Sequence, residues 1–377
     1  YYPCGIKAAQ VLGFVGSDNV GLDGVEAACD GALTGQTGSV ATAKGNYGAQ
    51  MQFHYEQYAD AVSGNDVVLT IDMTVQQMLE KHMQEAIEQY DVQNGAFGVV
   101  MDVNTGDILA MATLGSYDPN AYAVVYDAQK AEALEQQYQE AIAAEGEQQE
   151  QLLRAYNTAV ANARLSQWRN RVISDGYEPG STFKIITAAA GLEAGVVHLD
   201  DRFSCPGFRI VEDRKIRCHK VGGHGAETFV QGIQNSCNPV FIDIGLRLGT
   251  GRFCDYFEQF GLLGKTGVDL PGEAATIMHK EENIGQVELA TMSFGQSFQV
   301  TPIQMAATVS ALINGGKRVT PHFGVRILDK DKETVRELKY DDGKQIVSEE
   351  TSRTMQALLE SVVSEGSGKN AKIEGYH

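Results

Sequence analysis

A serine and a lysine three residues apart are the first residues in this chain that could do covalent chemistry. Ser181 follows Pro179-Gly180, which interrupts any preceding helix, and Lys184 opens an apolar, alanine-rich run that favours a helix. We therefore expect an α-helix to start at Ser181. Residues three apart on a helix share a face, so we expect the Ser181 hydroxyl and the Lys184 amine to lie within hydrogen-bond reach. A hydroxyl beside an amine is a nucleophile beside a base, a pair suited to acyl transfer.

A second hydroxyl and a carboxamide lie downstream, at another expected helix start. Ser236 and Asn238 flank Cys237, and a tight turn there can aim both polar side chains into one cleft. A Ser-x-x-Lys pattern alone occurs by chance in many proteins, whereas the two patterns together do so much less often. We therefore predict a catalytic set of Ser181, Lys184, Ser236 and Asn238, and we interpret Cys237 as a spacer.

Cysteines and histidines gather between these two motifs. Cys205, Cys218, His219 and His224 have the spacing C-x12-C-H-x4-H, which zinc sites use, in a stretch expected to be a long loop from 200 to 225. Neighbouring residues of a regular strand point to opposite faces, so either the chain turns at 218–219, or one of that pair is not a ligand and Asp213, Glu212 or solvent completes the shell. A structural zinc ion, a Cys205–Cys218 disulfide and two buried thiols are the alternatives.

The elements that must position these residues are helices and short strands. A β-rich run at 66–72 precedes helical spacing from 74 to 90. Two strands, 96–102 and 107–112, are joined by Asn104-Thr105-Gly106, which suits a hairpin. Later helices are expected at 228–233, 240–248, 253–260, 287–292, 301–312 and 348–365, and strands at 319–329 and 334–338. Helices mixed with hairpins indicate an α+β fold.

Two segments stand apart from this pattern. Residues 1–64 are rich in glycine and short polar runs, and we interpret them as the remnant of a small, β-rich accessory domain ahead of a main domain at 65–377. Ala, Glu and Gln dominate from about 121 to 165, which predicts one or two exposed helices. We interpret these helices as a solvated acidic insertion in preference to a partner-binding arm.

Composition excludes several classes of protein. The chain has 377 residues, 43% apolar, and a formal net charge of −19, which argues against nucleic acid or an anionic membrane surface as a partner. No apolar run approaches the roughly 18 to 20 residues needed to cross a bilayer. Six cysteines are too few for a disulfide scaffold in a chain of this length.

The Ser-x-x-Lys and Ser-x-Asn patterns resemble signatures of penicillin-binding proteins and class A β-lactamases. Over nearly its whole length the chain is similar to class B penicillin-binding proteins, the monofunctional D,D-transpeptidases, of the elongation or sporulation type. Segments that resemble this family in order are 21–26, 33–35, 69–72 with Gln76, 105–111, 117–120, 178–184, 236–238, 294–296 and 301–304.

The resemblance implies a fold and a role for each site residue. The fold would be the α+β transpeptidase domain shared with serine β-lactamases, an antiparallel sheet flanked by helices, preceded by a non-catalytic pedestal at 1–64. Ser181 would attack the carbonyl between two terminal D-alanines of a peptidoglycan stem peptide, and a neutral Lys184 would take its proton. Ser236 would relay a proton to the leaving D-alanine, and Asn238 would hold the donor's amide.

The family's third motif is the exception. Lys265-Thr266-Gly267 matches its letters, but in the family this motif lies on an inner strand near the end of the domain, whereas here it lies in a glycine-rich turn ahead of Ser293. We assign it no catalytic role. Family order places the functional motif just beyond His377, so we expect the C-terminal part of the domain to be missing and the 377-residue chain alone to acylate poorly.

The resemblance also implies ligands and partners. Stem peptides and β-lactams would bind, a SEDS-family glycan polymerase would be the partner, catalysis would need no cofactor, and a transmembrane helix upstream of Tyr1 would anchor an extracytoplasmic domain. The alternatives are a D,D-carboxypeptidase or serine β-lactamase, which pass the acyl group to water, and a non-enzymatic penicillin-sensing domain. Residues 1–64 argue against all three. Elongation, division and spore-cortex synthesis remain open roles.

Overall fold

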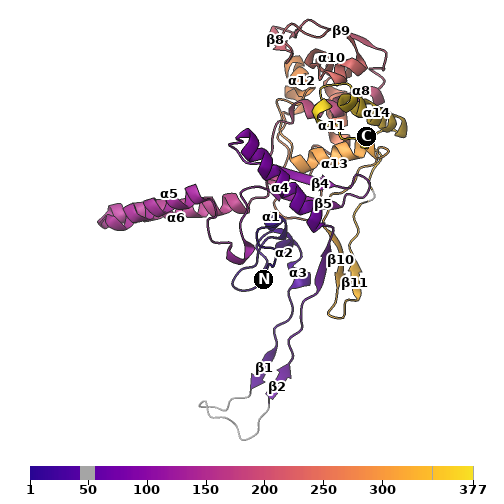
Figure 1. Cartoon of the computed structure of the whole chain (residues 1–377). Coiled ribbons are helices and arrows are strands. Elements are labelled where there is room, and N and C mark those ends of the chain that lie inside the picture. Colours follow the sequence, from indigo (N-terminus) through magenta and orange to yellow (C-terminus); the bar gives the residue numbers. More distant parts are fainter. Residues whose placement is uncertain (43–55, 342, 377) are drawn as a thin grey trace.

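The computed structural model describes residues 1–42, 56–341 and 343–376 (Figure 1). The part of the expected accessory domain at 43–55 lies outside the described residues. The helices are α1 (Ala9–Leu12), α2 (Gly24–Ala28), α3 (Asp30–Leu33), α4 (Met73–Tyr90), α5 (Ala128–Ala143), α6 (Gly146–Trp168), α7 (Arg171–Ser174), α8 (Lys184–Glu193), α9 (Phe229–Gln234), α10 (Asn238–Leu248), α11 (Thr250–Gln259), α12 (Gln286–Met292), α13 (Pro302–Ile313) and α14 (Glu349–Ser364).

The strands form small antiparallel sheets. They are β1 (Ser39–Thr42), β2 (Glu56–Ala59), β3 (Asp66–Leu69), β4 (Phe97–Met101), β5 (Ile108–Thr113), β6 (Arg202–Cys205), β7 (Phe208–Val211), β8 (Arg214–Arg217), β9 (Gly225–Thr228), β10 (Gly324–Leu328) and β11 (Thr334–Glu337). The predicted hairpin is confirmed as β4–β5, with Val99 opposite Met111. A three-stranded sheet in the order β11-β10-β3 joins segments from opposite ends of the chain. The α+β class is confirmed.

The expected loop at 200–225 is wrong, because half of its residues are in β-strands. β6 pairs with β9 and β7 with β8, in two separate antiparallel ribbons. These strands have only four residues each, and β8 reads Arg-Lys-Ile-Arg, with a single apolar residue to reveal a period of two. Pairing with a neighbouring strand, rather than local pattern, makes them strands.

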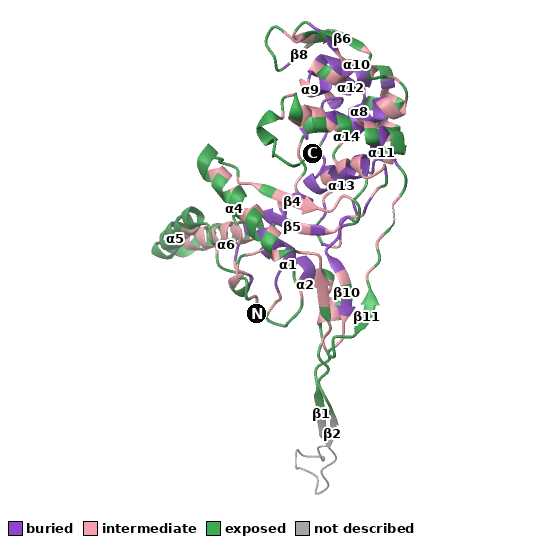
Figure 2. Cartoon of the chain, turned by 45° about the vertical axis from the view of Figure 1, so that its right-hand side comes forward, coloured by how far each residue is buried: buried purple, intermediate pink, exposed green. Residues whose placement is uncertain are grey.

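Helix α8 lies at the centre of the larger hydrophobic cluster. It packs against α10, α13 and α14, and its residues from Ile186 to Ala190 are buried (Figure 2). An ordinary amphipathic helix has one apolar face, whereas a helix that is apolar all round must be enclosed. The run that follows Lys184 in the sequence is therefore a core helix, and it fixes the position of the residues at its start.

A second hydrophobic cluster joins residues from the N-terminal region to the rest of the chain. Val11 and Val25 share it with Met111, Ile303 and Phe323. The division at 64/65 stays a prediction, since side chains from both of its sides meet in this cluster.

The acidic insertion forms two antiparallel helices, α5 and α6, that project from the body of the molecule (Figure 1). Their side chains are largely exposed (Figure 2), and the fully buried Ala141 is an exception. None of the described helices combines the length and the apolar composition that a membrane span requires.

Candidate active site

Ser181 lies in a single 3-10 turn, Gly180–Phe183, that leads directly into α8. The predicted start of the α-helix was therefore three residues early. Phe183 is 1% exposed, and its ring packs edge to face on that of Phe298, with 4.7 Å between the ring centroids. This packing in the hydrophobic core fixes the turn. Ser181 itself is exposed and faces a cleft.

A glycine contact holds the segment ahead of Ser181. Gly180 N donates to the Gly295 carbonyl at 2.8 Å, and Ser297 N donates to the Glu178 carboxylate at 2.7 Å. A Cβ on Gly295 would lie 2.1 Å from the Gly180 carbonyl oxygen, and its φ of +87° also favours glycine. The close approach of Gly295 to Gly180 requires a glycine at position 295, and Glu178 fixes the two segments together through its bond to Ser297.

Lys184 connects the two predicted motifs. Its amine lies 2.6 Å from the Ser236 carbonyl, 3.0 Å from the Ser236 hydroxyl and 2.7 Å from Asn238 Oδ1. The side chain is buried, and burial lowers its pKa to about 8, against the opposing influence of Cys218 and Cys237. A neutral amine fits this geometry, because it can donate to the two carbonyl oxygens and accept from the hydroxyl.

The expected direct contact between Ser181 and Lys184 is not formed, since no hydrogen bond among the described residues joins them. Ser181 nevertheless lines the same cleft as Ser236 and Asn238, the two residues that Lys184 contacts. A cleft of about 560 Å³ brings Ser181, Ser236 and Asn238 together above the buried amine. Its lining residues are Gly180, Ser181, Ile216, Arg217, His219, Ser236, Asn238, Phe294, Gln296 and Ser367.

The turn that carries Ser236 is strained. Ser236 has a φ of +50°, in the left-handed region, where a residue with a side chain costs about 1–2 kcal/mol. Asn238 begins α10, and its Nδ2 donates to the Arg217 carbonyl at 3.0 Å, which ties the turn to strand β8. Such conformations persist only where surrounding contacts determine them, and here those contacts orient Ser236 towards Lys184.

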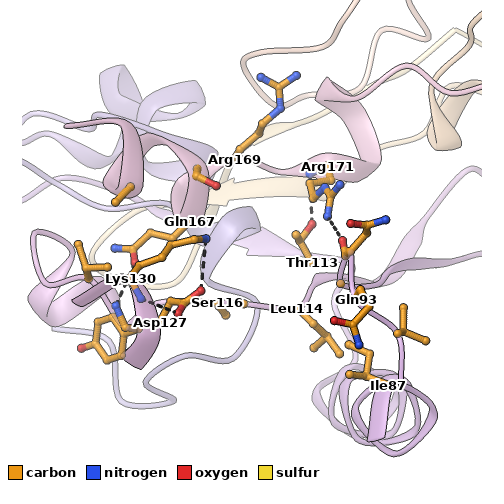
Figure 3. Close-up of a pocket in the computed structure, with 18 of the residues that line it drawn as sticks. Ile87, Gln93, Thr113, Leu114, Ser116, Asp127, Lys130, Gln167, Arg169 and Arg171 are labelled. Atoms are coloured by element: carbon orange, nitrogen blue, oxygen red, sulfur yellow. Dashed lines mark hydrogen bonds and ion pairs between the residues drawn. The ribbon is translucent and has the colours of Figure 1, made fainter. Parts of the chain in front are cut away.

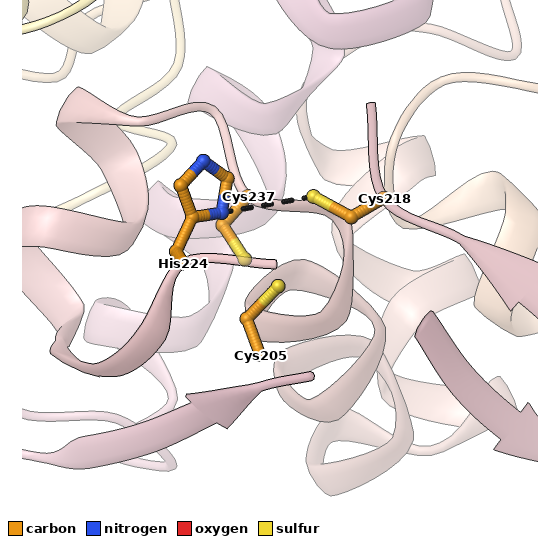
Figure 4. A group of neighbouring side chains, drawn as sticks. All are labelled: Cys205, Cys218, His224 and Cys237. Carbon is orange, nitrogen blue, oxygen red and sulfur yellow. Dashed lines mark hydrogen bonds between the residues drawn. The ribbon is translucent and has the colours of Figure 1, made fainter. Parts of the chain in front are cut away.

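Cys205, Cys218, His224 and Cys237 form a compact group of metal-ligand type (Figure 4). One ligand atom from each lies within 4.8 Å of all the others. His219, which was predicted, is not in this group, and Cys237, which was not predicted, is a member. His219 is exposed and lines the catalytic cleft, but it adjoins the group: its Nδ1 lies 3.8 Å from Cys218 Sγ, and its ring lies 5.3 Å from that of His224.

From the sequence, Cys237 is interpreted as a spacer between Ser236 and Asn238, and it is therefore absent from the predicted ligands. The turn that exposes Ser236 and Asn238 directs the residue between them inward, where Cys237 is fully buried. A third cysteine within reach of a C-x12-C pair was the available signal. All six cysteines are free thiols, so the structure contains no Cys205–Cys218 disulfide.

The electrostatics of this group follow from burial. Burial raises the pKa of the Cys237 thiol, and the Glu227 carboxylate raises it further. Burial also lowers the pKa of His224, which favours the neutral imidazole. Glu227 is 5% exposed, and its Oε1 has no hydrogen-bond partner among the described residues.

The Lys265-Thr266-Gly267 loop lies outside the cleft. The Thr266 amide and hydroxyl donate to Glu273 Oε1 at 2.6 and 2.7 Å, and Gly267 N donates to Oε2 at 3.3 Å. Val268 belongs to the second hydrophobic cluster, not to the cluster around α8. The Thr266 and Gly267 donors are thus satisfied by the protein's own carboxylate.

A second hollow, of about 630 Å³, lies at the base of α5 and α6 (Figure 3). Its charged side chains pair with one another: Lys130 lies 3.3 Å from Asp127, and both Arg169 and Arg171 pair with Asp175. It therefore presents no unpaired charge, and the chemistry lies at the cleft beside Ser181.

Ser181 ahead of a buried helix, Lys184 at the start of that helix and the Ser236–Asn238 turn are the residues of the Ser-x-x-Lys and Ser-x-Asn patterns, and the structure brings them to one cleft. The family model described as the penicillin binding protein transpeptidase domain matches residues 96–377. The chain belongs to this family, and the predicted family and fold are confirmed.

Two curated relatives match the chain over its whole length. The chain is 39% identical to stage V sporulation protein D of Bacillus subtilis over 378 aligned residues, which cover 100% of the chain and 53% of that protein. It is 27% identical to the peptidoglycan D,D-transpeptidase FtsI of Escherichia coli K12, covering 55% of it. The chain thus spans about half the length of these curated relatives.

Solved structures give the same result. Penicillin binding protein 3 of Mycobacterium tuberculosis, in its apo form, matches with a TM-score of 0.78 at 27% identity, covering 100% of this chain and 74% of that one. The same protein complexed with aztreonam matches with a TM-score of 0.78.

Proposed function

We propose that the protein is a peptidoglycan D,D-transpeptidase that works through an acyl-enzyme on Ser181. The observation that carries this proposal is Lys184: one buried amine contacts both Ser236 and Asn238 at the floor of the cleft that Ser181 borders. The name of the Escherichia coli relative supports the reaction class.

In the proposed reaction, Ser181 Oγ attacks the carbonyl carbon between two terminal D-alanines while its proton passes to the neutral Lys184 amine. The Ser181 backbone N–H, at the start of the turn, donates to the developing oxyanion. The C–N bond then breaks, and the departing D-alanine nitrogen receives a proton through Ser236. The amine of a second stem peptide attacks the resulting ester, which releases Ser181 and forms the cross-link.

Asn238 has a positioning role in this proposal. Its Oδ1 contacts Lys184 and its Nδ2 contacts the Arg217 carbonyl, so its amide plane is held from both ends. Substrate amide groups entering the cleft would meet an already oriented carboxamide. A β-lactam would use the same cleft, because its strained amide is attacked by the same serine. The SEDS-family partner and the membrane anchor stay predictions from the resemblance.

The test is acylation and turnover by the full-length protein. We expect a fluorescent penicillin to label Ser181, mass spectrometry to locate the adduct there, and Ser181→Ala to abolish labelling. Incubation with stem peptides should release cross-linked dimers together with D-alanine. Release of D-alanine without dimers would indicate a carboxypeptidase, and a persistent adduct with no product would indicate a sensor; either result would contradict the proposal.

We infer, as a separate proposal, that Cys205, Cys218, His224 and Cys237 bind a structural zinc ion. Three sulfurs and one imidazole nitrogen within 4.8 Å of one another suit tetrahedral zinc. Glu227 Oε1, a buried oxygen that accepts no hydrogen bond among the described residues, lies beside the group, and such unsatisfied atoms occur where an ion or water is bound.

Zinc content decides this second proposal. Protein purified without a histidine tag should contain one zinc per chain, and Cys237→Ser should lose it or hold it more weakly. Cys254→Ser is the matched control, because Cys254 is half-buried on α11 and is not part of the group. Metal-free wild-type protein with all of its thiols free would eliminate the site.

A further inference from the structure

Glu227 is a buried charged residue to which the proposed reaction gives no role. It lies on β9, opposite Phe203 of β6, and its side chain is almost completely buried. Oε2 accepts a hydrogen bond from Asn235 Nδ2 at 3.1 Å. Oε1 lies 3.9 Å from His224 Nδ1 and accepts no hydrogen bond among the described residues.

The Asn235 contact leads directly to the catalytic turn. Asn235 immediately precedes Ser236, whose positive φ has to be maintained by surrounding contacts. Backbone bonds from Ser236 N to Ile233 O and from Cys237 N to Gly232 O, both 2.9 Å, close the turn from the α9 side. On β9, Glu227 contacts the same turn through its bond to Asn235.

The other oxygen faces the cysteine and histidine group. His224 is three residues before Glu227, and Cys237 lies close enough for the carboxylate to raise the pKa of its thiol. One carboxylate therefore contacts the residue before Ser236 and borders two members of the proposed metal site. Oε1 and Cys218 Sγ lie 3.9 and 3.7 Å from the same ring nitrogen, His224 Nδ1, so the carboxylate lies beside the nitrogen that faces the group.

We propose that Glu227 is a positioning residue that joins the Cys205–Cys218–His224–Cys237 group to the catalytic turn. Oε2 holds Asn235 and, through it, the Ser236 turn that contacts Lys184, while Oε1 lies beside the His224 nitrogen that faces the group. This inference rests on the acyl-transfer function and the zinc site proposed above. It adds that the two are mechanically linked by one buried carboxylate.

Two substitutions separate the two contacts. Glu227→Gln keeps a carbonyl oxygen that can accept from Asn235 but removes the negative charge beside the group. Glu227→Ala removes both. Glu365→Gln is the matched control, because Glu365 accepts a comparable 3.1 Å bond from Gln234, one residue before Asn235, but in an exposed position.

Acylation of the full-length variants by a fluorescent penicillin separates the bond-forming rate constant from the dissociation constant. For Glu227→Ala we expect that rate constant to fall about 10- to 100-fold, the usual effect of losing such an orienting partner. Glu227→Gln should stay within about threefold of wild type in acylation while zinc is lost at lower chelator concentration. Glu365→Gln should match wild type in both measurements.

Cobalt substitution supplies a readout other than activity. In Glu227→Gln, the sulfur-to-cobalt charge-transfer spectrum should keep the shape of the wild-type spectrum, because the ligands are unchanged. A changed spectrum would show that Glu227 is itself a ligand and would overturn the positioning role. Circular dichroism and thermal unfolding establish whether Glu227→Ala is folded. If Glu227→Ala does not fold, the zinc retention of Glu227→Gln tests the proposal. Retention equal to that of the wild-type protein would then overturn the proposal.

The outcomes distinguish a failure of the role of Glu227 from a failure of the transpeptidase proposal or of the zinc proposal. If the wild-type protein is acylated and contains zinc, and Glu227→Ala has the same acylation rate and zinc content, only the proposed role of Glu227 is overturned. Zinc-free wild-type protein would remove the metal site, and a slowed Glu227→Ala would then still support the hold on Asn235. If wild type is not acylated, the transpeptidase proposal fails, and weaker zinc retention in Glu227→Gln still supports the contact with the group.

Discussion

Lys184 is the residue at which the two predicted motifs meet. Sequence spacing suggested that its amine would pair with Ser181, but the structure places it against Ser236 and Asn238, 52 and 54 residues away. Burial of an amine disfavours its charged form, and its remaining partners are oxygens that a neutral amine can satisfy. Its position thus prepares the base before any substrate enters.

The pH dependence of acylation should report this amine. Burial lowers the pKa of Lys184 to about 8, so only the deprotonated fraction, which grows as the pH rises, can accept the Ser181 proton. We expect the acylation rate constant to rise about tenfold between pH 6 and pH 7 and to level off above about pH 9. Rapid-mixing measurements with a fluorescent penicillin test this. A profile that is flat from pH 6 to pH 9, in protein that circular dichroism shows to be folded, would contradict it.

At the scale of an element, the loop at 265–273 is held by one buried carboxylate. The resemblance places the family's third motif on an inner strand, whereas here the loop folds back on Glu273, which is 8% exposed. A carboxylate that accepts several amide and hydroxyl bonds stabilises a turn, and it occupies the Thr266 and Gly267 donors.

Substitutions in this loop should therefore change stability and not chemistry. We expect Lys265→Ala to leave the acylation rate within about twofold of wild type, because the residue lies outside the cleft. Glu273→Gln should lower the free energy of unfolding by about 1–3 kcal/mol, since it disturbs a buried set of hydrogen bonds. Denaturant titration and penicillin labelling measure the two effects. A large loss of labelling in Lys265→Ala would assign the loop a catalytic role.

At the scale of the whole molecule, the catalytic helix and the acidic arm are separate structures. α8 is enclosed by α10, α13 and α14, whereas α5 and α6 pack mainly on each other and extend away from the body (Figure 1). The arm is joined to the body at its base, where Trp168 Nε1 donates to the Tyr122 carbonyl at 2.9 Å. This arrangement agrees with the interpretation of a solvated insertion.

Removal of the arm should leave the site intact. Replacing residues 129–164 with a short Gly-Ser loop keeps Gln167 and Trp168, whose side chains bond the 122–124 backbone. We expect the melting temperature to change by less than about 4 °C and the acylation rate by less than about twofold, because no buried contact to α8 is lost. Calorimetry and penicillin labelling provide the measurements. A strong loss of labelling with unchanged melting would show that the arm acts on the cleft.

The sequence by itself determined the local features: the helices expected at 74–90 and 301–312, the β4–β5 hairpin, and the turn at Ser236 that precedes a helix. Each depends on side-chain period, capping or turn residues within a few positions, which local sequence carries. Only the tertiary structure made strands of β6–β9, since pairing decides such short polar segments. It also placed Lys184 against Ser236 and Asn238, and it exchanged His219 for Cys237 in the metal-type group. The direction in which a residue points at a turn depends on the backbone path, and spacing along the chain does not contain that path.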